Sequence, residues 1–85
     1  MRIIKLTPLP DWILSIVAAD GRHGIFDVKP YLELEAFNAL RDHHQFVNVL
    51  NGGYFVEWEC GADLSADTIE ARWKVSGEAP SKAAA

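Results

Sequence analysis

The sequence lacks several features that would place it in particular protein classes. It holds one cysteine, Cys60, which excludes an internal disulfide. Because it also lacks a charged and then apolar leader, we expect a reducing cytoplasm. No apolar run approaches the roughly 18 residues that span a bilayer, so no membrane segment is expected. A phosphate-binding loop is not expected either, because the NGG run at 51–53 stands between predicted strands and not before a helix.

Basic residues are also scarce. Lys and Arg number 8 against 12 Asp and Glu, which gives a net charge of −4. Residues 31–71 hold one basic side chain, Arg41, against eight acidic ones. An acidic body repels phosphate backbones, so we expect no direct binding of nucleic acid. Charge alone favours a basic protein partner, although an acidic surface is usually only solubilising.

The length of 85 residues predicts one small domain over 1–76 and a flexible C-terminal tail over 77–85, where residues are small and polar. An apolar content of 49% is marginal for a chain of this size. Small domains often gain stability by association, and the segment 12–19 is apolar on both faces of a predicted strand. We therefore expect a homodimer.

Residues typical of strands recur along the chain. They predict five strands, at 2–10, 12–19, 22–28, 46–50 and 54–58. The Asp20–Gly21 dipeptide predicts a tight hairpin of type I′, which needs positive φ at both central positions. Gly61 predicts a turn after the fifth strand.

Two segments have the spacing typical of helices. Leu34, Phe37 and Leu40 predict a helix of about three turns over 31–42, unbroken or interrupted near Leu34. The segment 64–73 predicts a second helix with Ser65 as its N-cap. The resulting order βββαββα predicts an α+β fold, with an antiparallel-rich sheet of about five strands and two short helices packed on one face.

The segment GIFDVKPYLE, residues 24–33, poses the question of whether Asp27 and Lys29 serve chemistry or structure. Pro30 cannot donate to a strand ladder, and it biases Lys29 toward an extended conformation. Asp27 is placed to accept hydrogen bonds from the turn amides after it. We therefore predict structural roles for Asp27, Pro30, Gly21, Gly61 and Ser65.

Four groups of residues could carry chemistry, and for each group a role without catalysis or metal binding is favoured. His43 and His44 are neighbours that point about 100° apart on a helix, so they rarely share a metal, and His23 would have to be brought in by the fold. The acidic neighbours of Cys60 disfavour the thiolate that a nucleophile needs, so an inert thiol is expected. We predict no metal, no cofactor and no catalytic residue.

The carboxylates of Glu57, Glu59 and Asp63 are the third group. Paired carboxylates perform acid–base chemistry when burial separates their pKa values, but on a strand they more simply mark the solvent face. The tryptophans are the fourth group. Acidic neighbours make them poor platforms for stacking bases, so core packing is favoured, with at least one left for an interface.

Three segments together resemble a family of small bacterial proteins known only as a domain of unknown function, number twenty-four forty-two. They are PLPDWILSIVAADGRHGIFDVKPYL at 8–32, FNALRDHHQFVNV at 37–49 and VEWECGADLSADTI at 56–69. The marks of the family are FDVKP and W-x-x-G-x-D-L-S, in which Glu59 stands where the family often has proline. The resemblance implies an α+β fold, no established catalytic residues and a bacterial cytoplasm.

Some relatives in this family carry a helix-turn-helix domain after this one. Others are encoded beside another small protein, which implies toxin–antitoxin-like pairing. This chain ends before a helix-turn-helix domain could fit, so autonomous DNA binding is not expected. The leading hypothesis is a non-enzymatic interaction module, antitoxin-like or regulatory, that binds a basic protein through Glu57, Glu59, Asp63 and Trp58. The alternative is a small enzyme or metal-binding protein that uses the three histidines or the three carboxylates.

Overall fold

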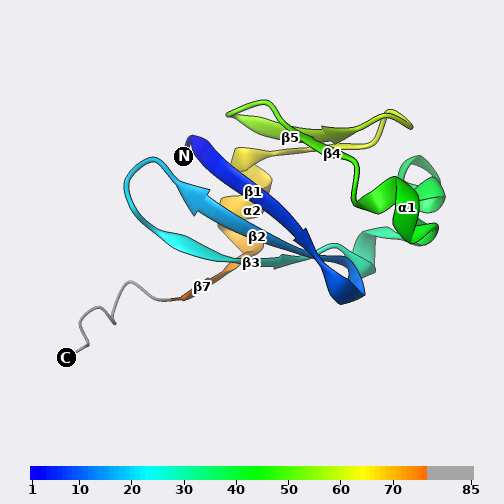
Figure 1. Ribbon diagram of the computed structural model, residues 1–85, viewed down its shortest axis with the longest axis horizontal. Coiled ribbons are helices and arrows are strands. Elements are labelled where there is room, and N and C mark those ends of the chain that lie inside the picture. The colour runs from blue at the N-terminus through cyan, green and yellow to red at the C-terminus, as the bar shows by residue number, and fades with distance from the viewer. Residues whose placement is uncertain (77–85) are drawn as a thin grey trace.

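The computed structural model describes residues 1–76, so the predicted tail, residues 77–85, lies outside the described residues. The described chain alternates short strands with α-helical and 3-10 helical segments (Figure 1). In chain order these are β1 (Ile3–Leu9), η1 (Pro10–Trp12), β2 (Ile13–Ala18), β3 (His23–Asp27), η2 (Lys29–Tyr31), η3 (Glu35–Arg41), α1 (His43–Phe46), β4 (Val49–Asn51), β5 (Phe55–Trp58), β6 (Asp63–Ser65), α2 (Ala66–Arg72) and β7 (Lys74–Ser76).

The strands form two antiparallel sheets. The larger sheet has the order β1-β2-β3-β7, and the smaller sheet has the order β4-β5-β6. In Figure 1 the smaller sheet lies above the larger one, and α2 lies behind β1 and β2. The predicted α+β class and the antiparallel pairing are confirmed, but the single sheet of about five strands is replaced by two sheets, and β7 and β6 each add an edge strand that the sequence did not predict.

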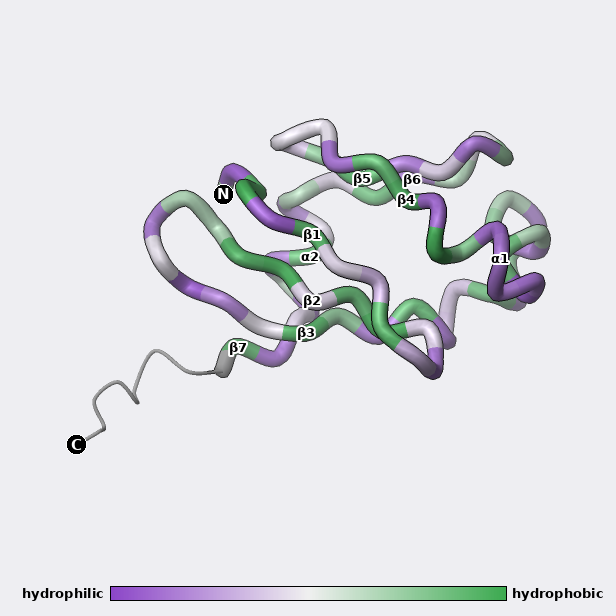
Figure 2. The backbone as a smooth tube through the Cα atoms, in the orientation of Figure 1, coloured by the Kyte–Doolittle hydropathy of each residue, from purple (hydrophilic) through white to green (hydrophobic). Residues whose placement is uncertain are grey.

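The central strand β2 buries one of its two apolar faces. Leu14, Ile16 and Ala18 are fully buried, whereas the alternate residues on the other face are half-buried. Figure 2 shows β2 as hydrophobic along most of its length, while the loop from β2 to β3 is hydrophilic. The alternation of burial follows directly from the period of two residues in a strand.

The hairpin between β2 and β3 differs from the predicted type I′ turn. Gly21 has a positive φ of 97°, but Asp20 does not share it. The N–H of Gly21 donates to the carbonyl of Ala18 at 3.0 Å, and the N–H of Ala18 donates to the carbonyl of Arg22 at 2.8 Å. The loop therefore has one residue more than a type I′ turn and needs a left-handed conformation only at glycine.

The predicted three-turn helix is replaced by 3-10 segments and one turn of α-helix. Leu34 is extended, with φ −81° and ψ 141°, so the chain is interrupted there. Asp42 then ends η3 and caps α1, because its carboxylate accepts from the N–H of His44 at 3.0 Å. Phe46 consequently belongs to α1, and the predicted strand at 46–50 begins only at Val49.

One hydrophobic core joins both sheets to the helical segments. Its largest buried side chain is Trp58, whose indole N–H donates to the carbonyl of Phe46 at 2.8 Å. The rings of Phe37 and Phe46 each lie with centroids 6.1 Å from that of Trp58. The smaller sheet is therefore fixed to α1 and η3 through a single aromatic cluster.

Candidate functional site

The outward side of the smaller sheet brings acidic and apolar side chains together. Glu57 on β5 pairs in register with Leu50 on β4 and with Asp63 on β6. Residues that pair across strands point to the same face of a sheet, so these side chains form one row. Phe55 and Ser65 pair in the next row on that face. We call these five residues the outer face.

The outer face is open to solvent and partly apolar. All five residues are exposed, and 61% of the surface of Leu50 and 39% of that of Phe55 is accessible. Tyr54, which precedes β5, is 66% exposed. Exposed apolar side chains beside charged ones are typical of surfaces that bind other molecules.

Two like charges face each other in the centre of this surface. Glu57 and Asp63 are register partners, and neither forms an ion pair with another residue of the described chain. Like charges placed directly opposite on neighbouring strands destabilise a sheet. The fold therefore holds two carboxylates together at a cost in stability that a cation between them would remove.

The turn between β5 and β6 adds a third carboxylate and an exposed thiol. Glu59 and Cys60 are exposed there, and Gly61 takes a positive φ of 99°. Trp58, by contrast, points into the core and is only 1% exposed. This corrects the placement expected from the sequence, because the indole N–H finds its acceptor inside the protein, and Trp58 does not reach the surface that the carboxylates form.

The three histidines are not brought together around a common point. His23 is exposed on β3, while His43 and His44 are neighbours on α1. The ring of His43 packs edge-on against Trp12, with centroids 5.2 Å apart, and the side chain of His44 is 97% exposed. Within residues 1–76, no group of three His, Cys, Asp or Glu residues could hold a metal ion.

Asp27 and Lys29 form a local network at the end of β3. The Asp27 carboxylate accepts from the N–H of Lys29 at 2.9 Å, and the Lys29 ammonium lies 3.1 Å from the same oxygen. That ammonium also donates to the carbonyl of Asp11 at 2.7 Å. Partial burial lowers the pKa of Lys29, but hydrogen bonds to Asp11 and Asp27 outweigh it and raise the pKa above its usual value. Pro30 follows in the first turn of η2.

This network supports an unusual backbone turn. Asp11 and Trp12 both have positive φ, 67° and 59°, which is strained for residues that carry a Cβ. The indole N–H of Trp12 donates to the carbonyl of Leu40 at 2.6 Å, while Lys29 holds the Asp11 end of the turn. These contacts stabilise the strained turn and tie the β1–β2 hairpin to η3.

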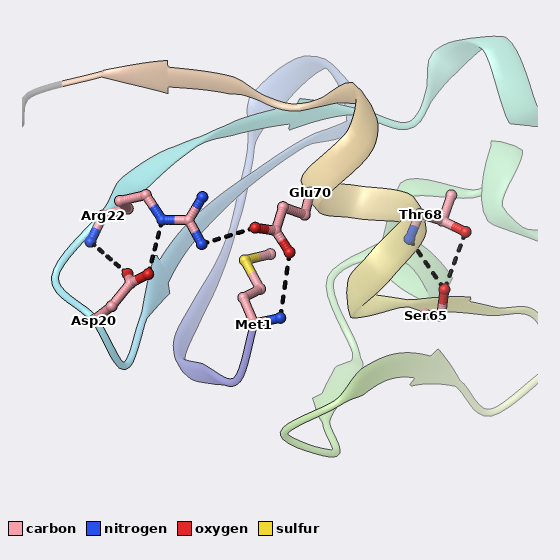
Figure 3. Close-up of polar contacts among 6 residues, drawn as sticks. All are labelled: Met1, Asp20, Arg22, Ser65, Thr68 and Glu70. Carbon is pink, nitrogen blue, oxygen red and sulfur yellow. Dashed lines mark hydrogen bonds and ion pairs between the residues drawn. The ribbon is translucent and has the colours of Figure 1, made fainter.

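A second polar network joins the β2–β3 hairpin to α2. Figure 3 shows Arg22 between Asp20 and Glu70, with distances of 2.9 and 2.8 Å. The hydrogen bond from Arg22 is the main reason that the pKa of Glu70 falls below its usual value, and the amino group of Met1 at 3.2 Å contributes further. The lowered pKa of Glu70 thus reflects the ion pair that joins α2 to the β2–β3 hairpin.

Ser65 has a double position in the site. Its hydroxyl accepts from the N–H of Thr68 at 3.0 Å and so caps α2 (Figure 3). It also belongs to the outer face through its pairing with Phe55. The cap therefore fixes where the outer face ends and where α2 begins.

The sequence match gives the family. A family model described as Protein of unknown function (DUF2442) matches residues 3–75. The chain belongs to this family. The match covers all of the strands except the end of β7, and the resemblance inferred from the sequence motifs is confirmed. No curated protein and no solved structure matches the chain.

The structure adds two apolar residues to the site that sequence reasoning placed on Glu57, Glu59, Asp63 and Trp58. Leu50 lies in the row of Glu57 and Asp63, and Phe55 lies beside Ser65 in the next row of the same face. The alternation of Phe55 with Glu57 along β5 carried a signal for Phe55, whereas Leu50 depends on the register of β4. Among the described residues, no helix is both long enough and apolar enough to cross a membrane.

Proposed function

We propose that the chain is a non-enzymatic interaction module, antitoxin-like or regulatory, whose outer face binds a basic segment of a partner protein. The observation that carries this proposal is the register pairing of Glu57 with Asp63, two carboxylates that no described residue neutralises. A lysine or arginine of the partner placed between them would turn a repulsive pair into two attractive contacts.

The apolar residues of the outer face indicate that the partner segment also contains apolar side chains. Leu50 and Phe55 flank the row of carboxylates and expose apolar surface. Successive side chains of an extended segment point to opposite sides, so a segment whose every second residue is in turn basic and apolar would place one kind of side chain over the carboxylates and the other over Leu50 and Phe55. Burial of the exposed apolar area then adds affinity that screening of charges by salt does not reduce.

A titration with a defined peptide tests this proposal. The probe, called the lysine–leucine peptide, is a short synthetic peptide in which lysine and leucine alternate at every second position with serine between them, and the readout is the change in backbone amide NMR signals. We expect saturable changes centred on β4, β5 and β6, an affinity that falls as salt is added, and no binding of the matched glutamate–leucine peptide.

Variants that neutralise single carboxylates distinguish binding at the outer face from attraction to the net negative charge of the protein. Glu57→Gln and Asp63→Asn are expected to weaken binding of the lysine–leucine peptide. Glu35→Gln removes another exposed carboxylate, on η3, and is expected to leave affinity unchanged. Equal weakening by all three variants, or signal changes spread over the whole surface, would reduce the interaction to nonspecific charge attraction and contradict the proposal.

We also propose a homodimer, formed by the uncovered face of the larger sheet. Ile25 is 40% exposed on that face, and Ile13 and Val17 are half-buried on it. A twofold pairing of these faces would cover the apolar side chains. Sedimentation equilibrium tests it: the mass should exceed 9.5 kDa and rise with concentration. Ile25→Lys should reduce association and Leu50→Lys should not, whereas a constant monomer mass contradicts the dimer.

The setting proposed for this module is the bacterial cytoplasm. Support comes from the family resemblance and from Cys60, a free and exposed thiol, which suits a reducing compartment. Fractionation of the source cells, with the chain detected by antibody, tests the location.

A further inference from the structure

A cleft separate from the outer face opens between β3, η2 and the end of α2. It encloses about 370 Å³. Its walls are formed by Phe26, Asp27, Pro30, Tyr31, Leu34 and Arg72. None of these residues belongs to the smaller sheet. The volume lies within the range of about 300–1,000 Å³ that small-molecule sites occupy.

The apolar walls of the cleft are held by aromatic packing. The ring of Tyr31 lies between those of Phe26 and Phe37, with centroid distances of 5.7 and 5.5 Å. Phe26 is 2% exposed, so it forms a fixed floor, whereas Leu34 is 52% exposed at the rim. A flat or branched apolar group would bury itself against these side chains with little rearrangement of the protein.

Of the two charged residues that line the cleft, Asp27 is already paired within the described chain and Arg72 is not. The Asp27 carboxylate is already engaged by the N–H and the ammonium of Lys29. Arg72 lies in the last turn of α2, is exposed, and forms no ion pair with a residue of the described chain. Its guanidinium is therefore the charge left available to a ligand, and a carboxylate matches its geometry with two parallel hydrogen bonds.

Asp27 also restricts which anions fit. Asp27 lines the cleft, so a second negative group on the ligand would approach a residue that already carries a negative charge. Like charges at close range repel each other, and the half-exposed position of Asp27 reduces but does not remove that effect. One carboxylate on an apolar body is favoured over a dicarboxylate.

From this arrangement we propose that the cleft binds a small monocarboxylate with an aromatic or branched aliphatic body. The carboxylate pairs with Arg72, and the apolar body lies against Tyr31, Pro30 and Leu34. This inference is independent of the proposed function, because it uses no residue of the outer face. It assigns a small-molecule site to the chain in addition to the protein-binding role proposed for the outer face.

An NMR titration of the full chain with 3-phenylpropanoate tests the proposal. Concentrations up to about 20 mM reach the millimolar Kd values expected of a small ligand in an open cleft. We expect saturable changes in the amide signals of Tyr31, Leu34 and Arg72. The neutral 3-phenylpropanamide should bind about three- to fivefold more weakly, the loss typical of one exposed ion pair, and succinate should bind more weakly still.

A charge-neutral variant and a matched control complete the test. Arg72→Gln should abolish the preference for the acid over the amide, while Arg41→Gln, at an exposed arginine on η3 outside the cleft, should preserve it. Unchanged amide spectra away from each substitution establish that the variants fold. Absence of saturable change, equal affinity for acid and amide, or retention of the preference in Arg72→Gln would each overturn the proposal.

Discussion

Replacement of Trp58 by phenylalanine is expected to be one of the most damaging conservative changes in this chain. Trp58 is 1% exposed and contacts the rings of Phe37 and Phe46. Its indole N–H donates to the carbonyl of Phe46. Phenylalanine keeps an aromatic ring in the site but removes the donor and part of the volume.

The expected magnitude follows from these two losses. A buried carbonyl deprived of its donor costs about 1–3 kcal/mol. The space left by the smaller ring costs roughly another 1 kcal/mol, as for other modest reductions of core volume. The free energy of unfolding should therefore fall by about 2–4 kcal/mol, a large part of the roughly 5–15 kcal/mol that a domain possesses. The melting temperature should fall by at least about 10 °C.

Urea unfolding followed by circular dichroism measures this loss. The matched control is Trp73→Phe, because Trp73 is only half-buried and contacts Arg22 through its ring face, 5.7 Å from the guanidinium carbon. We expect the control to lose about 1 kcal/mol or less. A Trp58→Phe variant within about 0.5 kcal/mol of wild type, or no less stable than the control, would refute the assignment of Trp58 to the core.

Three further changes test other parts of the structure. Asp27→Ala should lower the free energy of unfolding by about 1 kcal/mol, because the N–H of Lys29 loses its acceptor, and thermal denaturation that matches wild type would contradict this. Gly24→Ala should detach β7, because a Cβ there would collide with the carbonyl oxygen of Lys74; faster hydrogen exchange at the amides of β7 measures it, and unchanged protection would contradict it. Because the folded-state pKa of Glu70 is lowered, its stabilising contribution is present above the ordinary pKa of about 4.5 and is lost as pH falls through the folded-state value. The stability gap between wild type and Glu70→Gln should therefore be full near neutral pH and close in acid, and a gap that widens in acid would contradict the ion pair.

Much of the larger sheet could be predicted because its signals are local. The β2–β3 hairpin is marked by Gly21 and by alternating apolar residues on both sides, and these depend on neighbours in sequence. The helix over 31–42 was misjudged for an equally local reason. Leu34, Phe37 and Leu40 are spaced by three, which suits the 3.0-residue turn of a 3-10 helix as well as the α-helix.

The parts that could not be predicted depend on contacts distant in sequence. β7 is three residues long and exists because Gly24 lets the backbone at Lys74 approach β3 closely. Of the candidate site, exposed carboxylates on β5 followed from alternation, but the pairing of Glu57 with Asp63 depends on the length of the turn between their strands. Trp58 is expected at the partner surface because aromatic residues are common in interfaces, but the same alternation along β5 places it with Val56 on the buried face, where its indole N–H donates to the carbonyl of Phe46.

The charge row on the outer face is the centre of the functional account, and one measurement tests it most directly. The affinity of the lysine–leucine peptide is determined by isothermal titration calorimetry for wild type and for Glu57→Lys, which faces Asp63 with the opposite charge and so forms an internal pair across the strands. The account predicts that the variant folds and binds the peptide at least about tenfold more weakly, a change of roughly 1.4 kcal/mol. An affinity within about twofold of wild type would contradict the claim that Glu57 and Asp63 form a binding surface.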